Sequence, residues 1–268
     1  MRAGLIAAGL AFGIAGAAMA QGLSGTIAPR GGTTDSDATG SSGTGWLDGE
    51  LRFGLGRNLT ALFDAAGGSY DSLTSLGGRG QVFWRDPSLG LVGVLAEVAD
   101  RDGLMQWRTG VKGELYLGPV TLRGQAGYVF GDSKGGLEIN DSGYGVLSGG
   151  FYGVSGLGVN GGAMMQDGRG TGFGGLEAEI PGLPRFITAT LDGAAGAYGY
   201  RQLLVGLKFY LGAGADAPLQ QRHVGLTPGL PSYDIGASAR PRPASAPASA
   251  TTSSAQPCIP SPSGPPCP

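Results

Sequence analysis

Apolar and polar side chains alternate through residues 103–131, on both sides of a reversal at Gly118-Pro119. Before the reversal the two sets are Met105, Trp107, Val111, Leu115 and Leu117 against Gln106, Arg108, Lys112 and Glu114. After it they are Val120, Leu122, Ala126, Tyr128 and Phe130 against Thr121, Arg123 and Gln125. Successive side chains of a β-strand point to opposite faces of its sheet, so this pattern predicts an antiparallel hairpin with one oily and one charged face.

The same alternation recurs along most of the chain and predicts an all-β fold. The expected strands lie near residues 46–56, 58–68, 78–86, 90–99, 103–117, 119–131, 143–154, 156–166, 171–180, 185–193 and 200–211. Glycine supplies 55 of the 268 residues, but between residues 45 and 212 it is interleaved with Leu, Val, Phe and Tyr. Because glycine disfavours helices and no 3.6-residue apolar period is present here, Gly-rich strands are expected.

Connection lengths predict how these strands are arranged. Tight turns fall at Gly56-Arg57, 86–89, Gly118-Pro119, Ser155-Gly156 and 181–184, and longer polar connections fall near 69–77, 100–102, 132–142, 167–170 and 194–199. Outer-membrane barrels have short periplasmic turns and longer external loops. Because the strands alternate in direction and the chain enters from the periplasm, one more outward strand is required before residue 46. Residues 23–30 are the candidate, with 31–45 as the polar loop that follows them. We therefore expect an antiparallel up-and-down transmembrane β-barrel of about 12 strands, with ten as the alternative.

The first twenty residues predict export. Met1-Arg2 precedes an apolar run that ends near Ala17, and Ala18-Met19-Ala20 supplies the small residues of a cleavage site. These features are typical of a secretory signal peptide, with the mature chain starting at Gln21. No later apolar run approaches the roughly 18 residues of a spanning helix, so insertion into a membrane would use strands.

The region from residue 213 to 268 differs from the rest in composition, because it is rich in Pro, Ala and Ser. Such a sequence does not bury a core, so we expect a disordered periplasmic tail. Its role is either that of an unstructured spacer or a contact with peptidoglycan or another envelope protein. Cys258 and Cys267, the only two cysteines, allow a small disulfide in the oxidising periplasm but cannot crosslink the barrel.

Charge and the scarcity of histidine exclude several functions. Loss of Arg2 with the signal peptide lowers the basic total from 18 to 17, against 20 acidic residues, which argues against nucleic acid as a partner. Residues 131–135 match the G-x-S-x-G pattern of serine hydrolases, but no helix is expected after them and the only histidine, His223, lies in the tail. No catalytic, metal or cofactor site is predicted, and the chain is not expected to be an enzyme.

Taken together, the chain resembles Gram-negative outer-membrane β-barrel proteins, and more loosely the porin-like ones. The likeness rests on the signal peptide, the alternating hairpins and the last strand, residues 203–211, which resembles the assembly signal of such barrels. Residues 83–91 also resemble functionally uncharacterised barrels. The resemblance implies a location in the outer membrane, with lipid and the barrel-assembly machinery as partners. Aromatics such as Trp46, Trp84, Trp107 and Tyr200 fall toward expected strand ends, where they suit a membrane interface.

The polar faces of the expected strands carry charges of both signs. The candidate lumen-lining residues are Glu50, Arg52, Arg79, Arg85, Arg108, Lys112, Glu114, Arg123, Glu177, Glu179 and Lys208, and Glu97 shares their parity. Inside a barrel these ions would either line a wet, weakly selective channel or form a salt-bridge network that fills the lumen.

Three functions are therefore compatible with the sequence. The first is a porin-like passive channel for ions or small solutes. The second is a closed structural or surface-interaction barrel. The third is a secreted soluble β-sandwich that binds a ligand, because alternation alone does not say whether the oily face meets a core or lipid.

Overall fold

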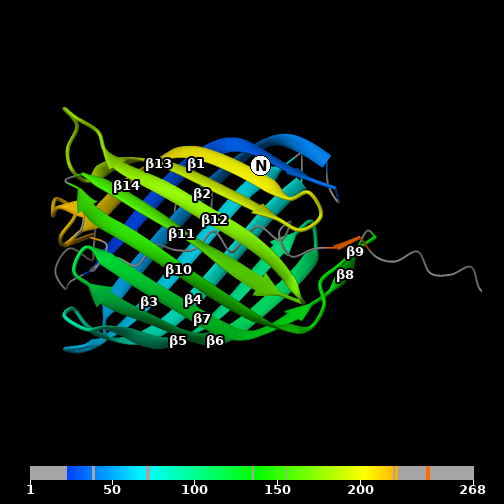
Figure 1. Ribbon diagram of the computed structural model, residues 1–268, viewed down its shortest axis with the longest axis horizontal. Coiled ribbons are helices and arrows are strands. Elements are labelled where there is room, and N and C mark those ends of the chain that lie inside the picture. The colour runs from blue at the N-terminus through cyan, green and yellow to red at the C-terminus, as the bar shows by residue number, and fades with distance from the viewer. Residues whose placement is uncertain are drawn as a thin grey trace, which may run out of the picture.

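The computed structural model describes residues 23–37, 40–70, 73–134, 136–154, 156–219, 221–222 and 240–241. Twelve antiparallel strands form a closed barrel (Figure 1). They are β1 (Ser24–Ser36), β2 (Gly40–Gly54), β3 (Leu59–Tyr70), β4 (Leu73–Asp86), β5 (Gly90–Arg101), β6 (Leu104–Leu117), β7 (Val120–Gly131), β10 (Ser142–Val154), β11 (Leu157–Gln166), β12 (Arg169–Glu179), β13 (Ile187–Gly196) and β14 (Arg201–Gly212). Within the described part, no helix is long and apolar enough to cross a membrane.

The barrel closes because β1 pairs with both β2 and β14. Thr26, for example, lies opposite Glu50 on β2 and opposite Tyr210 on β14. Every other barrel strand pairs with two neighbours, so no strand edge is left exposed. The predicted all-β barrel of twelve strands is confirmed.

A small second sheet lies at the end of the barrel opposite the tight turns. The connection between β7 and β10 contains β8 (Ser133–Lys134) and β9 (Leu137–Glu138), which pair with each other. β15 (Arg240–Pro241), from the Pro-rich region, pairs with β9 (Figure 1). Two residues of the region predicted to be a disordered tail therefore have a defined backbone partner. Cys258 and Cys267 lie outside the described residues.

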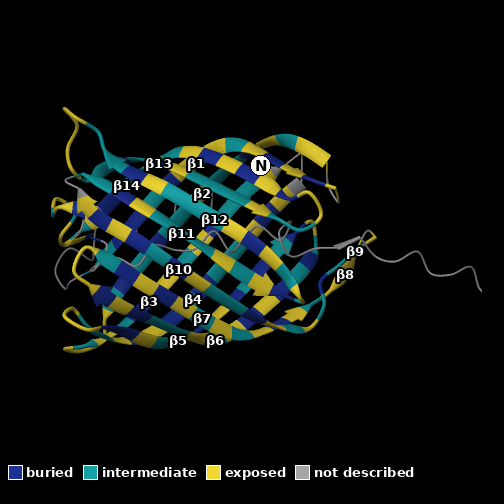
Figure 2. Ribbon diagram, in the orientation of Figure 1, coloured by how far each residue is buried: buried dark blue, intermediate teal, exposed yellow. Residues whose placement is uncertain are grey.

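Exposed and buried residues alternate along each strand (Figure 2). On β6, Trp107 and Val111 are 53% and 58% exposed, whereas Arg108 and Glu114 are 2% and 3% exposed. A soluble β-sandwich would bury the apolar side chains and expose the charged ones. The closure of the twelve strands into one barrel and this inverted burial therefore contradict the sandwich alternative and give the barrel an oily exterior.

Glycine is required at points where an aromatic ring crosses the inner surface. A Cβ atom built on Gly110 would lie 2.5 Å from the carbonyl oxygen of Ala126 and 2.7 Å from Tyr144 Oη. Tyr144, on β10, is 5% exposed and accepts a hydrogen bond from Gln125 Nε2 at 2.8 Å. The absence of a side chain at Gly110 therefore lets the tyrosine lie across the wall of the barrel.

Two predicted loops are wrong. Residues 31–45 are mostly strand, because β1 continues to Ser36 and β2 begins at Gly40. Residues 69–77 are also mostly strand, since only residues 71 and 72 separate β3 from β4. About 9–11 residues suffice to cross a bilayer, so strands of 12 to 15 residues continue beyond it. The ends of these strands are polar and show no alternation of apolar and polar residues, which is why the sequence predicts loops there.

Two aromatic positions also differ from expectation. Trp46 has the inward parity of Asp48, its Nε1 atom is buried, and its ring lies 2.6 Å from a Cβ built on Gly68. Tyr200 is 2% exposed. Neither side chain belongs to the outer face, whereas Trp84 and Trp107 are 43% and 53% exposed there.

Candidate functional site

Five charged side chains form a continuous row on the inner surface of β2–β6. The strand register places Glu50 opposite Asp64, Asp64 opposite Arg79, Arg79 opposite Glu97, and Glu97 opposite Arg108. Side chains directly opposite each other on one face have Cβ atoms about 5 Å apart. The register alone therefore brings together carboxylates and guanidinium groups from five consecutive strands, and we call these five residues the charged row.

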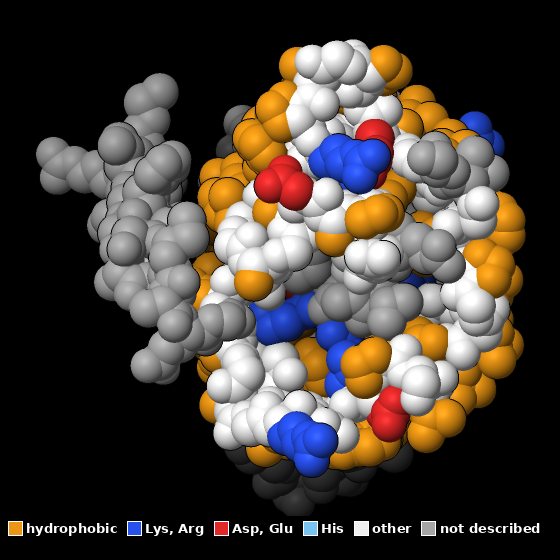
Figure 3. Space-filling model, turned by 90° about the vertical axis from the view of Figure 1, so that its left-hand side faces the viewer, with side chains coloured by type: hydrophobic (Ala, Val, Ile, Leu, Met, Phe, Trp, Pro, Cys, Tyr) orange, Lys and Arg blue, Asp and Glu red, His pale blue; other side chains and the backbone are white. Residues whose placement is uncertain are grey.

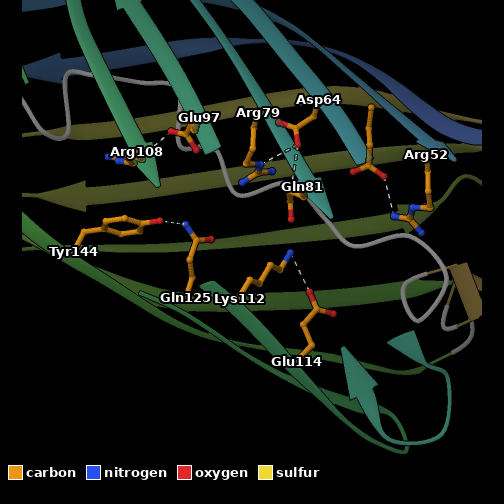
Figure 4. Close-up of polar contacts among 11 residues, drawn as sticks. Arg52, Asp64, Arg79, Gln81, Glu97, Arg108, Lys112, Glu114, Gln125 and Tyr144 are labelled. Atoms are coloured by element: carbon orange, nitrogen blue, oxygen red, sulfur yellow. Dashed lines mark hydrogen bonds and ion pairs between the residues drawn. The ribbon is translucent and has the colours of Figure 1, made fainter. Parts of the chain in front are cut away.

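Hydrogen bonds connect the charged row (Figure 4). Arg79 Nε donates to Asp64 Oδ2 at 2.9 Å, and Arg108 Nη1 donates to Glu97 Oε1 at 3.1 Å. Arg108 Nη2 also donates to Gln166 Oε1 on β11 at 2.9 Å. Because β7 and β10 lie between β6 and β11 in the barrel, this bond runs across the concave interior. The row is thus linked to β11, three strands further round the barrel.

A second group of charges lies closer to the tight turns. Glu114 Oε1 is 3.2 Å from Lys112 Nζ and 3.7 Å from Arg123 Nε. Arg123 Nη2 donates to Tyr152 Oη at 3.3 Å, and Arg52 Nη2 donates to Glu50 Oε1 at 2.9 Å. Three basic groups therefore share two carboxylates here (Figure 4 shows the Lys112 and Arg52 pairs).

A third group joins the first and last strands. Arg30 Nη2 lies 2.8 Å from Asp48 Oδ2 on β2, and Arg30 Nη1 lies 3.1 Å from Asp192 Oδ2 on β13. Glu177 accepts hydrogen bonds from Thr188 Oγ1 at 2.8 Å and from the Tyr210 hydroxyl, and Lys208 Nζ lies 3.5 Å away. These contacts bring together residues from both ends of the barrel sequence.

Between β10 and β13 the inner surface has fewer charges, among them Glu177, Glu179 and Asp192, and many of its positions are small and uncharged. Its inward positions include Ser148, Gly150, Gly158, Asn160, Gly162, Thr171, Gly175, Thr188 and Thr190. Most inward charges instead lie on β2–β7, so the interior has a charged wall (β2–β7) and a small-residue wall (β10–β13).

All predicted lumen residues lie on the enclosed face. Those that are buried are Glu50, Arg52, Arg79, Arg108, Glu114, Arg123 and Glu177. The half-buried ones are Arg85, Lys112, Glu179 and Lys208. The sequence interpretation missed Arg30, Asp64, Asp192 and Arg222 as members of the network. Alternation was a weak signal for Asp64, which stands alone among Ala and Leu on β3, and for Arg30, which lies in a strand with little apolar character.

Some inward polar atoms are buried without a protein partner. They include Nε and Nη1 of Arg52, Oγ of Ser148 and Oγ1 of Thr190. In a dry core each would cost about 1–3 kcal/mol. Figure 3 views the end of the barrel that lies at the left in Figure 1, and Lys or Arg side chains are visible in its central depression. The interior therefore presents polar groups that water or a solute would satisfy.

Comparisons with known proteins add a shared fold. No protein-family model matches the sequence, and no curated protein sequence matches it. The solved KdgM porin matches with a TM-score of 0.53 and 7% identity, over 69% of this chain and 98% of that chain. A KdgM porin in complex with disordered oligogalacturonate matches with a TM-score of 0.51 and 9% identity, over the same shares of the two chains. An outer-membrane channel from Pseudomonas putida F1 matches with a TM-score of 0.48 and 13% identity, over 70% and 94%.

The closed barrel, its oily exterior and the two KdgM porin structures define the class: this chain has the fold of a Gram-negative outer-membrane β-barrel protein. Its architecture is porin-like, with a polar interior. At these low identities the likeness extends to the fold, so the role of the lumen must be argued from the chain's own side chains.

Proposed function

We propose that this protein is a passive channel that lets ions or small solutes cross the outer membrane. One observation carries the proposal: the closed barrel encloses charges of both signs, and some of their donor atoms, such as Arg52 Nη1, are buried without a protein partner. A solute that enters this interior would exchange its hydration shell for fixed polar groups, which is how channels select. No covalent chemistry is part of the proposal.

The balance of charge suggests weak selectivity. In the charged row, Arg79 and Arg108 are accompanied by Glu50, Asp64 and Glu97, so neither sign dominates. A lumen of this kind would pass small ions of both signs, with a preference set locally by groups such as Lys112 and Arg123 rather than by a uniform field.

A closed structural barrel is the second candidate, and one feature favours it. Arg108 bridges Glu97 and Gln166, and Arg30 bridges Asp48 and Asp192. Each of these bridges spans at least four consecutive strands and holds its side chains over the inner surface, which would narrow the lumen. In either case, we propose outer-membrane lipid and the barrel-assembly machinery as partners, and peptidoglycan or envelope proteins as contacts of the C-terminal region.

Planar-bilayer recording separates the two candidates. Purified full-length protein, with folding verified by heat-modifiable gel migration, should give discrete openings. Arg108→Ala, which removes a bridge across the interior, should raise the conductance of those openings, whereas Arg57→Ala in an exposed turn should leave it unchanged. Folded protein that never opens, with or without Arg108, would support the closed barrel instead.

A further inference from the structure

The chain turns back into the barrel after its last strand. β14 ends at Gly212, which has a φ of 79°, and Gly214 has a φ of 80°. These left-handed conformations suit glycine and reverse the direction of the chain. The amide nitrogens of Gln221 and Arg222 then donate to the Pro218 carbonyl at 2.9 and 3.1 Å. The residues that follow β14, gold in Figure 1, lie at the left-hand end of the barrel.

Two side chains of this turn are buried in the mouth of the barrel. Leu219 and Arg222 are each 2% exposed. A Cβ built on Gly158 would lie 2.7 Å from the Tyr152 ring and 3.5 Å from Leu219 Cδ2. Glycine at position 158 therefore leaves the space in which Tyr152 and Leu219 lie. The side chains of an exposed spacer would remain in solvent. The burial of Leu219 and Arg222 therefore shows that this part of the C-terminal region packs against the barrel.

The guanidinium group of Arg222 is held like a bound ligand. Nη2 donates to Glu179 Oε1 at 2.6 Å, and Nη1 donates to the Arg185 carbonyl oxygen at 2.6 Å. The guanidinium carbon lies 4.4 Å from the centre of the Tyr210 ring. A carboxylate, a carbonyl and an aromatic face are the groups that recognise a guanidinium ion. They come from β12, the following turn and β14.

The charge of Glu179 does not depend on Arg222 alone. Arg222 Nε is buried without a hydrogen-bond partner, so the site does not use every donor of the guanidinium. Glu179 has a second basic neighbour, because Arg185 Nε lies 4.0 Å from its Oε2 atom and the Arg185 side chain is 59% exposed. If Arg222 withdrew, Arg185 would remain to neutralise Glu179. This avoids most of the penalty of an unpaired carboxylate in a partly buried place.

We propose that Glu179, the Arg185 carbonyl and Tyr210 form a guanidinium-binding site at the mouth of the lumen, and that Arg222 occupies it as a tethered plug. Solutes that carry a guanidinium group compete for this site. The proposal rests on the channel function proposed above, and it adds a ligand class to it.

Trypsin tests the docking without any conductance measurement. Cleavage after Arg222 in the folded full-length protein, followed by mass spectrometry, should be slow because this side chain is buried. Glu179→Gln should accelerate it at least about tenfold, since the charge-assisted bond is lost. Cleavage after the exposed Arg57 serves as the internal reference. Equal rates after Arg222 in the two proteins would overturn the docking, whether or not the barrel conducts.

Conductance tests the plug and the ligand class. Arg222→Gln should raise single-channel conductance roughly twofold or more, because a group at the mouth is removed. Arg57→Gln, which makes the same charge change in an exposed turn at this end, should have no effect. In Arg222→Gln the site is vacant, so dilute guanidinium ion should lower the conductance relative to sodium at equal ionic strength. Adding Glu179→Gln should abolish this block.

The outcomes separate this proposal from the channel itself. A conducting parent whose openings are unchanged by Arg222→Gln would overturn the plug and leave the channel intact. Equal responses to guanidinium and sodium in Arg222→Gln would overturn the ligand class. Folded protein that never conducts would overturn the channel, and the trypsin result would then decide the binding site alone.

Discussion

The charged wall and the small-residue wall are built on the same backbone but have different interiors. On β2–β6 the register brings charged side chains such as Asp64, Arg79 and Glu97 opposite each other. On β10–β13 the corresponding inward positions hold residues such as Ser148 and Gly162. Both walls have the same antiparallel pairing and the same oily exterior. The shared backbone pairing and outer face therefore close the barrel over two inner surfaces of different chemistry, one rich in charge and one rich in small residues.

The largest expected effect is on the charged wall. Arg79→Ala removes the partner of Asp64 and leaves buried carboxylates on both sides. Loss of one partner from a buried ion pair costs about 3–5 kcal/mol. Urea titration of the barrel in lipid vesicles should show a decrease in unfolding free energy of that order. Arg57→Ala is the control, and a loss no larger than that of the control would mean that the charged row is not structural.

The second-largest effect is expected from moving a lysine from the inner to the outer face of β6. Lys112 is tolerated because it points inward and lies 3.2 Å from Glu114. Val111→Lys would place the same side chain on the lipid face near the middle of β6, where Val111 is 58% exposed. Lysine at the bilayer midplane costs about 2–4 kcal/mol. Urea titration should show this loss, whereas Val111→Leu should stay near the parent. A harmless lysine at 111 would contradict the assignment of faces.

The small-residue wall should be sensitive to volume rather than to charge. A Cβ on Gly162 would lie 2.5 Å from Ser148 Cβ and 2.8 Å from the Phe173 ring. Gly162→Ala should therefore destabilise the barrel by about 1–3 kcal/mol. The matched change is Gly124→Ala, where nothing lies within 4 Å. The urea midpoints of the two variants should differ, and equal midpoints would show that this wall is not closely packed.

The smallest effect concerns ion preference. Arg52 and Arg123 contribute to the group in which basic side chains outnumber carboxylates. Replacing both with glutamine should shift the reversal potential toward cations, with a permeability ratio changed about twofold to threefold. The exposed Arg57→Gln should not shift it. An unchanged reversal potential in the double variant would mean that the charged wall does not control permeating ions.

The sequence predicts the barrel well because its strongest signal is local. Alternation along strands such as β6 and β7 identifies the inner and outer faces. The alternation of short and long connections then requires an additional N-terminal strand, which brings the number of strands to twelve. The strand ends at 31–45 were missed because polar residues beyond the membrane pair through their backbones, without an apolar face to reveal them. Trp46 was misplaced because an aromatic at a strand end suits either side of the wall.

The lumen network was only partly predictable. Glu97 and Arg108 lie on adjacent strands of one hairpin, so the alternation of their strands is enough to suggest that they meet. Arg30 and Asp192 are 162 positions apart in sequence and meet only because β1 closes on β14. The docking of Arg222 depends on the same closure, and the composition of the region after β14 argued against any fixed position. Contacts that form only when β1 pairs with β14 leave no pattern in the local sequence.

Planar-bilayer recording of the purified, folded, full-length protein tests the central claim most directly. If the enclosed charges line a passage, the membrane current should show discrete openings with a linear current–voltage relation and weak ion selectivity. Folded barrels that insert into the bilayer and never produce an opening, even after Arg222→Gln and Arg108→Ala, would contradict the account and favour a closed structural barrel.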